Sequence, residues 1–271
     1  MTRMRTTRAR WLVSAAVVFL IACSTVPLTG RSRFNYVSNE QAMQLGAEAY
    51  PQLLDGERIV RRGRDYDQVI RVGEKIRRAA EEGKFPWKHR GTFEWEFTVV
   101  DNDEVVNAWA LPGGKVAVYT GILRVAGSDD GLATVMGHEV AHALAEHGGE
   151  RMTQAAALDF GRQGAQAILG QQSDTTMALF DQAWNIGSSA GVLLPFSRKH
   201  ESEADEIGLM LMAAAGYDPR EAVAFWERMS GGGGEEPWEF LSTHPNHQTR
   251  VRRLTELMPK ALEIYNGERD L

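Results

Sequence analysis

Two spacings of apolar residues alternate along the chain, and together they predict a predominantly helical α+β fold. Alternation with period two covers 93–99 and 115–120, and a turn at Pro112, Gly113 and Gly114 leads into the second stretch, which indicates two strands of a small sheet. Spacings of three and four residues elsewhere predict helices at 38–50, 65–80, 128–147, 198–215, 218–229 and 248–257, with two more between 152 and 194.

Boundary residues support two of these helices. Ser38 is followed three residues later by Gln41, an arrangement in which each side chain caps a backbone N–H of the other. Ser128 precedes two acidic residues, which favour the positive end of a helix dipole, and the helix it begins is expected to end at Gly148 and Gly149. The apolar residues of this helix form a stripe, so we expect it to bury one face.

The first 22 residues are typical of an export signal. Four arginines precede an unbroken apolar stretch of 12 residues that ends at Ala22. A helix that spans a bilayer needs ~20 apolar residues, so a permanent transmembrane anchor is the weaker interpretation.

Cys23 is the only cysteine, and its position indicates lipidation. With Leu20, Ile21 and Ala22 it resembles the bacterial lipobox, whose cysteine is acylated and then holds the protein on a membrane surface; an ordinary buried thiol is the alternative. Ser24 resembles the sorting residue of outer-membrane lipoproteins. We therefore expect a cell-envelope protein facing the periplasm, built as a signal peptide at 1–22, a lipidated tether at 23–34 and a single catalytic domain at 35–271.

The charge balance argues against nucleic acid as a partner. The chain has a net charge of −6, and removal of the four arginines in the signal changes it to −10. An acidic chain of this kind lacks the basic surface that nucleic-acid binding requires.

His138, Glu139 and His142 form the pattern His-Glu-x-x-His inside a predicted helix. Residues four apart share a helix face, so both imidazoles can reach one metal ion while Glu139 reaches a water molecule beside it. Two core histidines bonded to carbonyls are the alternative, and they would leave Glu139 buried without a partner. The pattern therefore predicts a catalytic metal site.

A catalytic zinc needs a third protein ligand, and Glu201 is the candidate. It lies on a predicted helix with Asp205 one turn later on the same face, where the aspartate could accept the free ring N–H of a ligating histidine. An acidic, solvated helix face is the alternative, and spacing alone leaves the choice open.

Four segments resemble the M48 family of peptidases, especially its soluble bacterial lipoprotein members. They are HEVAH, ESEAD some sixty residues later, NAWALPGG before the first and THPNHQTR after the second. The resemblance implies a zincin-like metalloprotease domain with a small β-sheet beside the HEVAH helix. It also implies one Zn²⁺ per chain, held by His138, His142 and Glu201, with Asp205 bonded to a ligand.

The resemblance also implies the chemistry. Zinc would activate a water, Glu139 would act as general base, and the substrates would be peptide bonds of extended or misfolded proteins. His244 and Arg250 are expected to contact the site, and either His244 or Arg250 could stabilise the oxyanion. In some relatives the histidine takes the open zinc position and keeps the enzyme latent.

An exposed edge strand can bind an extended peptide through its backbone, and we expect the second predicted strand to do so. The residues of this substrate strand are Gly114, Lys115, Val116, Ala117 and Val118.

Two further expectations concern the alternatives. A non-proteolytic, chaperone-like envelope lipoprotein that binds client proteins is the competing function, although an intact Glu139 argues against it. Trp184, Met210 and Trp226 are interpreted as core residues. The remaining histidines are interpreted as surface residues: His89, His147, His200 and His247.

Overall fold

The computed structural model describes residues 23–35, 37–81, 93–154, 196–231, 238–244 and 247–269. The expected signal at 1–22 lies outside these residues, as do Trp184, His89 and nearly all of the two helices expected between 152 and 194. Among the described helices none combines the length and the apolar character needed to cross a membrane.

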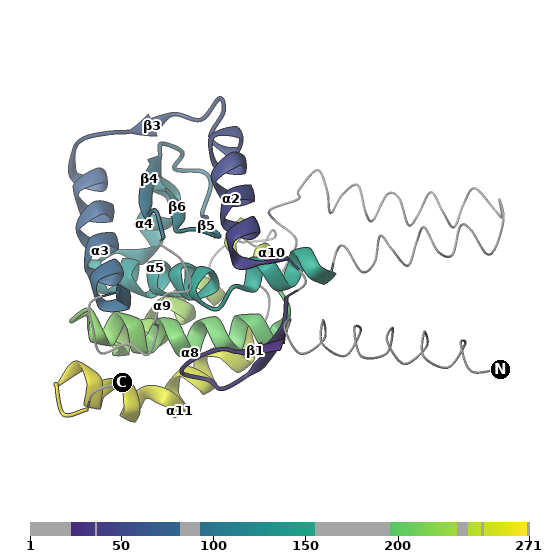
Figure 1. Ribbon diagram of the computed structural model, residues 1–271. Coiled ribbons are helices and arrows are strands. Elements are labelled where there is room, and N and C mark those ends of the chain that lie inside the picture. Colours follow the sequence, from purple (N-terminus) through teal and green to yellow (C-terminus); the bar gives the residue numbers. More distant parts are fainter. Residues whose placement is uncertain are drawn as a thin grey trace, which may run out of the picture.

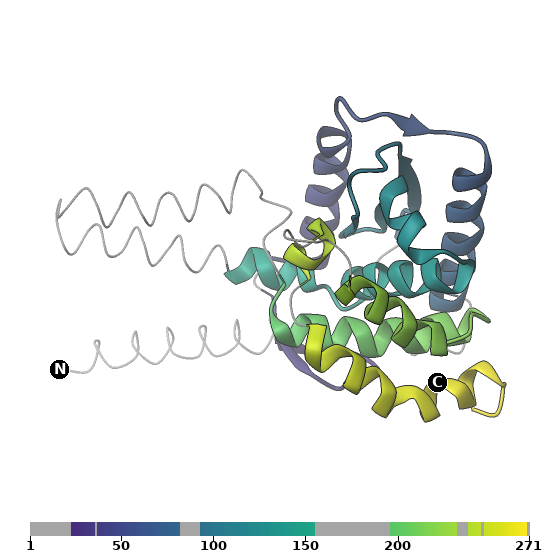
Figure 2. The same cartoon turned by 180° about the vertical axis from the view of Figure 1, so that it is seen from behind.

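Helix α5 lies between a small sheet and a pair of helices. The sheet, with α2 and α3 at its sides, lies on one side of α5, and α8 followed by α11 lies on the other, as both views show (Figures 1 and 2). This mainly helical α+β arrangement confirms the predicted fold class. The helices are α2 (Asn39–Leu53), α3 (Arg64–Glu81), α4 (Thr120–Ala126), α5 (Asp129–Leu144), α8 (Arg198–Ala214), α9 (Arg220–Gly231), α10 (Glu239–Thr243) and α11 (His247–Tyr265).

The four-stranded sheet has the order β3-β4-β6-β5. Its strands are β3 (Ile59–Val60), β4 (Glu96–Val100), β5 (Ala108–Leu111) and β6 (Lys115–Tyr119). Strand β6 pairs in parallel with β4 on one side and antiparallel with β5 on the other.

The expectation that Gly114, Lys115, Val116, Ala117 and Val118 form an exposed edge strand is therefore wrong. The hydrogen-bonding groups of β6 are used on both sides, and the edge beside it is β5. The short segment 108–111 precedes the Pro-Gly-Gly turn and carries no polar alternation, so the sequence pattern gave little sign of it.

Helix α5 is buried on all sides. Ser128 caps it by accepting a hydrogen bond from the Gly131 N–H, as the sequence predicts, but every residue from Gly131 to Leu144 is buried. The prediction of a single buried face is wrong because α8, α9, α3 and the sheet surround the helix. It also ends before the glycines: Glu146 adopts φ 58°, and a new helical segment covers 147–154.

Residues 23–34 are folded against the domain, where the sequence suggested a tether. Strands β1 (Cys23–Thr25) and β2 (Ser32–Phe34) form an antiparallel hairpin, and Val26 at its turn is fully buried in the main core. We call residues 23–34 the N-terminal hairpin. Arg33 bonds Glu146 at 2.5 Å and the Ala145 carbonyl at 2.5 Å, which attaches the hairpin to the end of α5.

Two glycines let α5 and α8 approach closely. A Cβ on Gly208 would lie 2.8 Å from the His138 backbone N, and one on Gly137 would lie 2.9 Å from the Gly208 carbonyl oxygen. Only residues without a side chain fit at this crossing. The crossing is one residue away from His138, so it brings the acidic residues of α8 against the imidazoles of α5.

Candidate metal centre

Four buried side chains converge between α5, α8 and α10. The ligand atoms of His138, His142, Glu201 and His244 all lie within 4.8 Å of one another. The Glu201 carboxylate lies 3.5 Å from Nε2 of His138 and 3.4 Å from Nε2 of His142, and each of the three side chains is 2% exposed. Helices α5 and α8, which are far apart in the sequence, therefore bring together the three ligands that the sequence predicts.

Orphaned polar atoms show that this cluster fits a cation. Oε1 of Glu139, Oε1 of Glu201 and Nε2 of His244 are buried, and none has a hydrogen-bond partner among the described residues. Buried groups of this kind cost free energy unless something satisfies them, and a metal ion would do so. Two imidazoles and a carboxylate are a usual donor set for zinc. Although burial opposes ionisation, the surrounding imidazoles keep the pKa of Glu201 well below its ordinary range, so it is anionic.

Glu139 lies between the ligand cluster and the sheet edge. Its Oε2 accepts a hydrogen bond of 3.1 Å from the Ala110 N–H of β5, and its Oε1 lies 3.3 Å from Nε2 of His244. Burial, reinforced by the charge of Glu201, raises the pKa of Glu139 to about 8. A carboxylate with a pKa near neutrality is suited to accept and return a proton.

His244 directs its Nε2 at the site. Its Nδ1 lies 3.1 Å from the Phe240 carbonyl oxygen, which can only accept, so the ring proton is on Nδ1 and the Nε2 lone pair is free. Burial lowers the pKa of His244 to about 3, which keeps the ring neutral. The sequence prediction that His244 reaches the site agrees with this placement, and the geometry is that of a fourth ligand.

Asp205 and Arg250 lie behind the ligands. Nδ1 of His138 lies 2.9 Å from Asp205, and Arg250 bonds Asp205 through Nε at 2.6 Å and Glu201 through Nη2. The guanidinium lies 3.8 Å above the ring of Trp226. Two of its three nitrogens therefore hold the carboxylates, while Nη1 is buried without a partner among the described residues.

The interpretation of His147 and His200 as surface residues is wrong. They are 0% and 2% exposed, and their rings stack with centroids 4.4 Å apart. Nδ1 of His147 lies 2.9 Å from Nδ1 of His142, and its Nε2 lies 2.9 Å from Glu203. Helical spacing does not place His147, because the chain turns at Glu146 and the spacing from His142 is lost. Met210 and Trp226 are core residues, as predicted.

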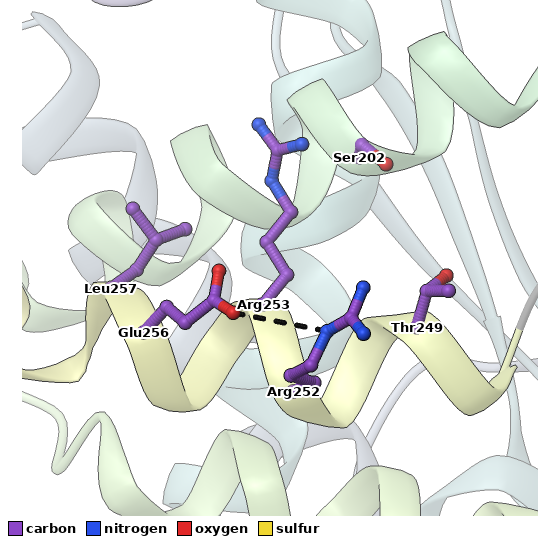
Figure 3. Close-up of a pocket in the computed structure, with 6 residues that line it drawn as sticks. All are labelled: Ser202, Thr249, Arg252, Arg253, Glu256 and Leu257. Atoms are coloured by element: carbon purple, nitrogen blue, oxygen red, sulfur yellow. Dashed lines mark ion pairs between the residues drawn. The ribbon is translucent and has the colours of Figure 1, made fainter.

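A surface hollow of about 300 Å³ lies away from this cluster, between α8 and α11. Figure 3 shows its charged lining, with Arg252 paired to Glu256 at 3.8 Å. It contains none of the converging side chains described above, and its arginines are solvent-exposed. Its lining residues are Ser202, Thr249, Arg252, Arg253, Glu256 and Leu257.

Comparisons with known proteins agree with the geometry. The family model described as Peptidase family M48 matches residues 68–258. The chain is 34% identical over 266 residues to "Mitochondrial metalloendopeptidase OMA1" of Schizosaccharomyces pombe, an alignment that covers 95% of this chain and 74% of that protein. It is 33% identical over 248 residues to "Metalloendopeptidase OMA1, mitochondrial" of Homo sapiens, covering 88% of this chain and 46% of the relative.

A bacterial relative is more distant. The "Beta-barrel assembly-enhancing protease" of Escherichia coli is 24% identical over 261 residues, which cover 92% of this chain and 51% of that protein. The chain thus spans about half the length of the human and E. coli relatives. The relatives do not support the finer expectation of a bacterial lipoprotein branch, because the more similar ones carry mitochondrial names.

Proposed function

The chain belongs to Peptidase family M48 and is a metalloendopeptidase, and from this premise we propose that it is a zinc enzyme whose ion is held by His138, His142 and Glu201, with Glu139 as general base. The single observation that carries this proposal is the buried convergence of the ligand atoms within 4.8 Å, beside carboxylate and imidazole atoms that have no hydrogen-bond partner in the described parts of the chain.

The proposed reaction needs a group that accepts a proton and later returns it, and Glu139 is that group. A zinc ion at this site would polarise the peptide carbonyl and lower the pKa of water toward ~7. Glu139 accepts the proton of the attacking water and returns it to the leaving amine. The Ala110 N–H fixes the orientation of the Glu139 carboxylate through Oε2, which leaves Oε1 directed at the cluster. Of the two residues expected to stabilise the oxyanion, Arg250 has a donor at Nη1, whereas the neutral His244 ring presents a lone pair at Nε2 and therefore fits the role of a ligand better.

We propose that an extended peptide substrate pairs with the outer edge of β5. Tyr119 donates its N–H to the Asn107 carbonyl, so Asn107 faces β6, and Ala108 and Ala110 direct their backbone groups away from the sheet. The Ala110 N–H already bonds Glu139, and the Ala108 N–H bonds the side chain of Asn107, so the two carbonyls are the groups that a peptide could pair with. An extended peptide laid along this edge would pass beside Glu139. Backbone pairing recognises an extended chain more than particular side chains, and this favours extended or misfolded proteins as substrates.

Substituting the base tests the proposal. Glu139→Gln should lower the rate of casein cleavage by about 10²–10⁴-fold, since general acid–base catalysis contributes that much. The bound zinc should be unchanged, because Glu139 is not a ligand. Equal cleavage by both proteins would reject the enzymatic mechanism and favour a chaperone-like protein that binds clients without cutting them.

Latency is a second candidate, favoured by the position of His244. Its neutral ring presents an unpartnered Nε2 within ligand distance of the other three groups, so it can complete a four-ligand site that excludes substrate. The His244→Ala variant should then cleave casein faster than the wild type. A rate equal to or below that of the wild type would exclude autoinhibition by this histidine.

The location is also a proposal. The apolar stretch before Cys23 supports acylation of this residue and attachment to the outer membrane, facing the periplasm. A Cys23→Ser variant expressed in a Gram-negative bacterium should lose incorporation of labelled palmitate and leave the membrane fraction. Unchanged labelling would reject lipidation at this residue.

A further inference from the structure

His147 is a buried polar residue that the proposed reaction does not use. It lies immediately after the turn that ends α5, it is 0% exposed, and both of its ring nitrogens have partners. Nδ1 lies 2.9 Å from Nδ1 of His142, and Nε2 lies 2.9 Å from Oε2 of Glu203. The ring therefore links a metal ligand to a carboxylate.

The hydrogen-bonding pattern admits one arrangement of protons when His142 ligates a metal. His142 presents Nε2 to the cluster, so its Nδ1 carries the proton and must donate. Nδ1 of His147 must then accept, which leaves the His147 proton on Nε2, where the Glu203 carboxylate accepts it. Every donor in this chain of contacts meets one acceptor.

The N-terminal hairpin fixes the far end of the chain of contacts. Nε of Arg31 bonds Glu203 at 2.6 Å, the Thr29 hydroxyl also bonds Glu203, and Nη1 of Arg31 bonds Glu150 at 2.9 Å. Glu150 in turn lies 3.3 Å from Nε2 of His200. All four oxygens of these two carboxylates already contact a donor side chain, so this cluster does not have the free anionic oxygens that a second metal site needs.

We propose that His147 is a positioning residue for the metal ligand His142. The relay His142–His147–Glu203–Arg31 holds the His142 ring in one tautomer and one orientation, and it includes the N-terminal hairpin in the support of the site. Partners of metal-ligating histidines act in this way, and their loss typically weakens metal binding by about 10–100-fold. The inference rests on the proposed function, because it assumes that His142 ligates zinc.

Three substitutions of His147 separate its two contacts. Asparagine places an amide oxygen near the position of the imidazole Nδ1, so His147→Asn can still accept from His142. Glutamine reaches the position of Nε2, so His147→Gln keeps the bond to Glu203 and loses the one to His142. His147→Ala loses both. Zinc affinity, measured on the full chain by competition with a chelator, should fall by about 10–100-fold in His147→Ala. It should fall similarly in His147→Gln and less in His147→Asn.

Glu146→Gln is the matched control. Glu146 anchors the same hairpin at the same end of α5, but its carboxylate bonds Arg33 and Asn35, so the zinc affinity of this variant should equal that of the wild type. The absorption spectrum of the cobalt-substituted protein adds a readout that general destabilisation does not move: it should change in His147→Ala and His147→Gln and not in Glu146→Gln.

The outcomes are distinct. Wild-type affinity in His147→Ala, or equal losses in all three His147 variants and the control, would overturn the relay. If the His147 variants do not fold, Glu203→Gln and Arg31→Gln decide: weaker zinc binding in both supports the relay, and unchanged binding in both overturns it. Failure of the proposed metal site looks different, because the wild type itself would then bind zinc no more tightly than Glu201→Ala.

Discussion

The two metal-ligand imidazoles on α5 are supported in different ways. His138 meets a carboxylate directly, since its Nδ1 lies 2.9 Å from Asp205, which Arg250 of α11 holds at 2.6 Å. His142 meets a second imidazole, His147, and only then a carboxylate and an arginine of the N-terminal hairpin. One support thus comes from α11 and the other from the N-terminal hairpin, so two segments that lie far apart in the sequence hold one site.

The difference has an electrostatic consequence. Burial disfavours a charged His138, but Asp205 and Glu201 outweigh it and raise the pKa of His138 to about 9. Burial and the neighbouring positive charges hold the pKa of His142 well below its ordinary range, although Glu201 opposes them. Without metal, His138 is therefore protonated at neutral pH and His142 is not. A directly bonded carboxylate makes an imidazole more basic, whereas a neutral imidazole partner fixes its orientation without adding charge.

Removing the ligand that both imidazoles share should have the largest effect. Glu201 lies 3.5 Å from His138 and 3.4 Å from His142, so Glu201→Ala takes away the only carboxylate of the predicted triad and leaves Arg250 with a single buried acid. Zinc binding should fall below detection at micromolar concentrations, and casein cleavage should stop. Metal analysis after dialysis measures the first effect. Stoichiometric zinc in this variant would mean that the histidines, including His244, suffice.

Loss of the Asp205 charge that supports His138 should have the second-largest effect. Asp205→Asn keeps the shape of the side chain but removes the charge that faces both His138 and Arg250. Zinc affinity should decrease by about 10–100-fold, comparable with the loss of a ligand's hydrogen-bond partner elsewhere. Chelator competition measures the decrease. Comparison with His147→Ala then ranks the two supports, and an unchanged affinity in Asp205→Asn would show that the charged support is dispensable.

Helical spacing predicted His138 and His142 as ligands, whereas it left Glu201 open and the resemblance to the M48 family assigned that residue. His138 and His142 are four residues apart inside a helix that Ser128 caps, and Glu201 and Asp205 are four apart on α8 behind a cap at Ser197. The capping box of Ser38 and Gln41 is also present. Caps and four-residue spacings can be predicted from the sequence because each depends only on residues within about one helical turn.

The rest of the site depends on contacts between distant segments. His147 follows a backbone turn at Glu146, and its partners come from α8 and from the hairpin that contains Arg31. The sequence pattern does not predict the close crossing at Gly137 and Gly208. A glycine inside a helix destabilises it relative to alanine, so it does not by itself indicate a packing contact. The order of strands in the sheet is likewise set by packing, which is why the substrate edge was assigned to the wrong strand.

The different basicity of the two imidazoles predicts proton release. Zinc binds neutral imidazole, so binding at pH 7 should displace the proton from His138, and affinity should rise about tenfold per pH unit up to about pH 9. Calorimetry in two buffers of different ionisation enthalpy counts the protons. A Glu139→Gln background removes the titration of Glu139 itself. Asp205→Asn should reduce the release and His147→Asn should not; equal release in both would contradict the assignment of the raised pKa to Asp205.

The smallest effect is expected from an exposed pair on the same two helices. Arg253 of α11 bonds Glu206 of α8 at 3.1 Å, three residues from Arg250, but its side chain is 47% exposed. Water screens such pairs, so Arg253→Gln should change the free energy of unfolding by no more than about 0.5 kcal/mol in urea titrations and leave zinc affinity at the wild-type value. The comparison of supports assumes that α11 acts through the buried guanidinium of Arg250 alone. A loss of zinc binding in Arg253→Gln would show instead that the packing of the whole helix α11 positions His138. Of the two supports compared, the relay to His142 would then be the one that acts through single side chains.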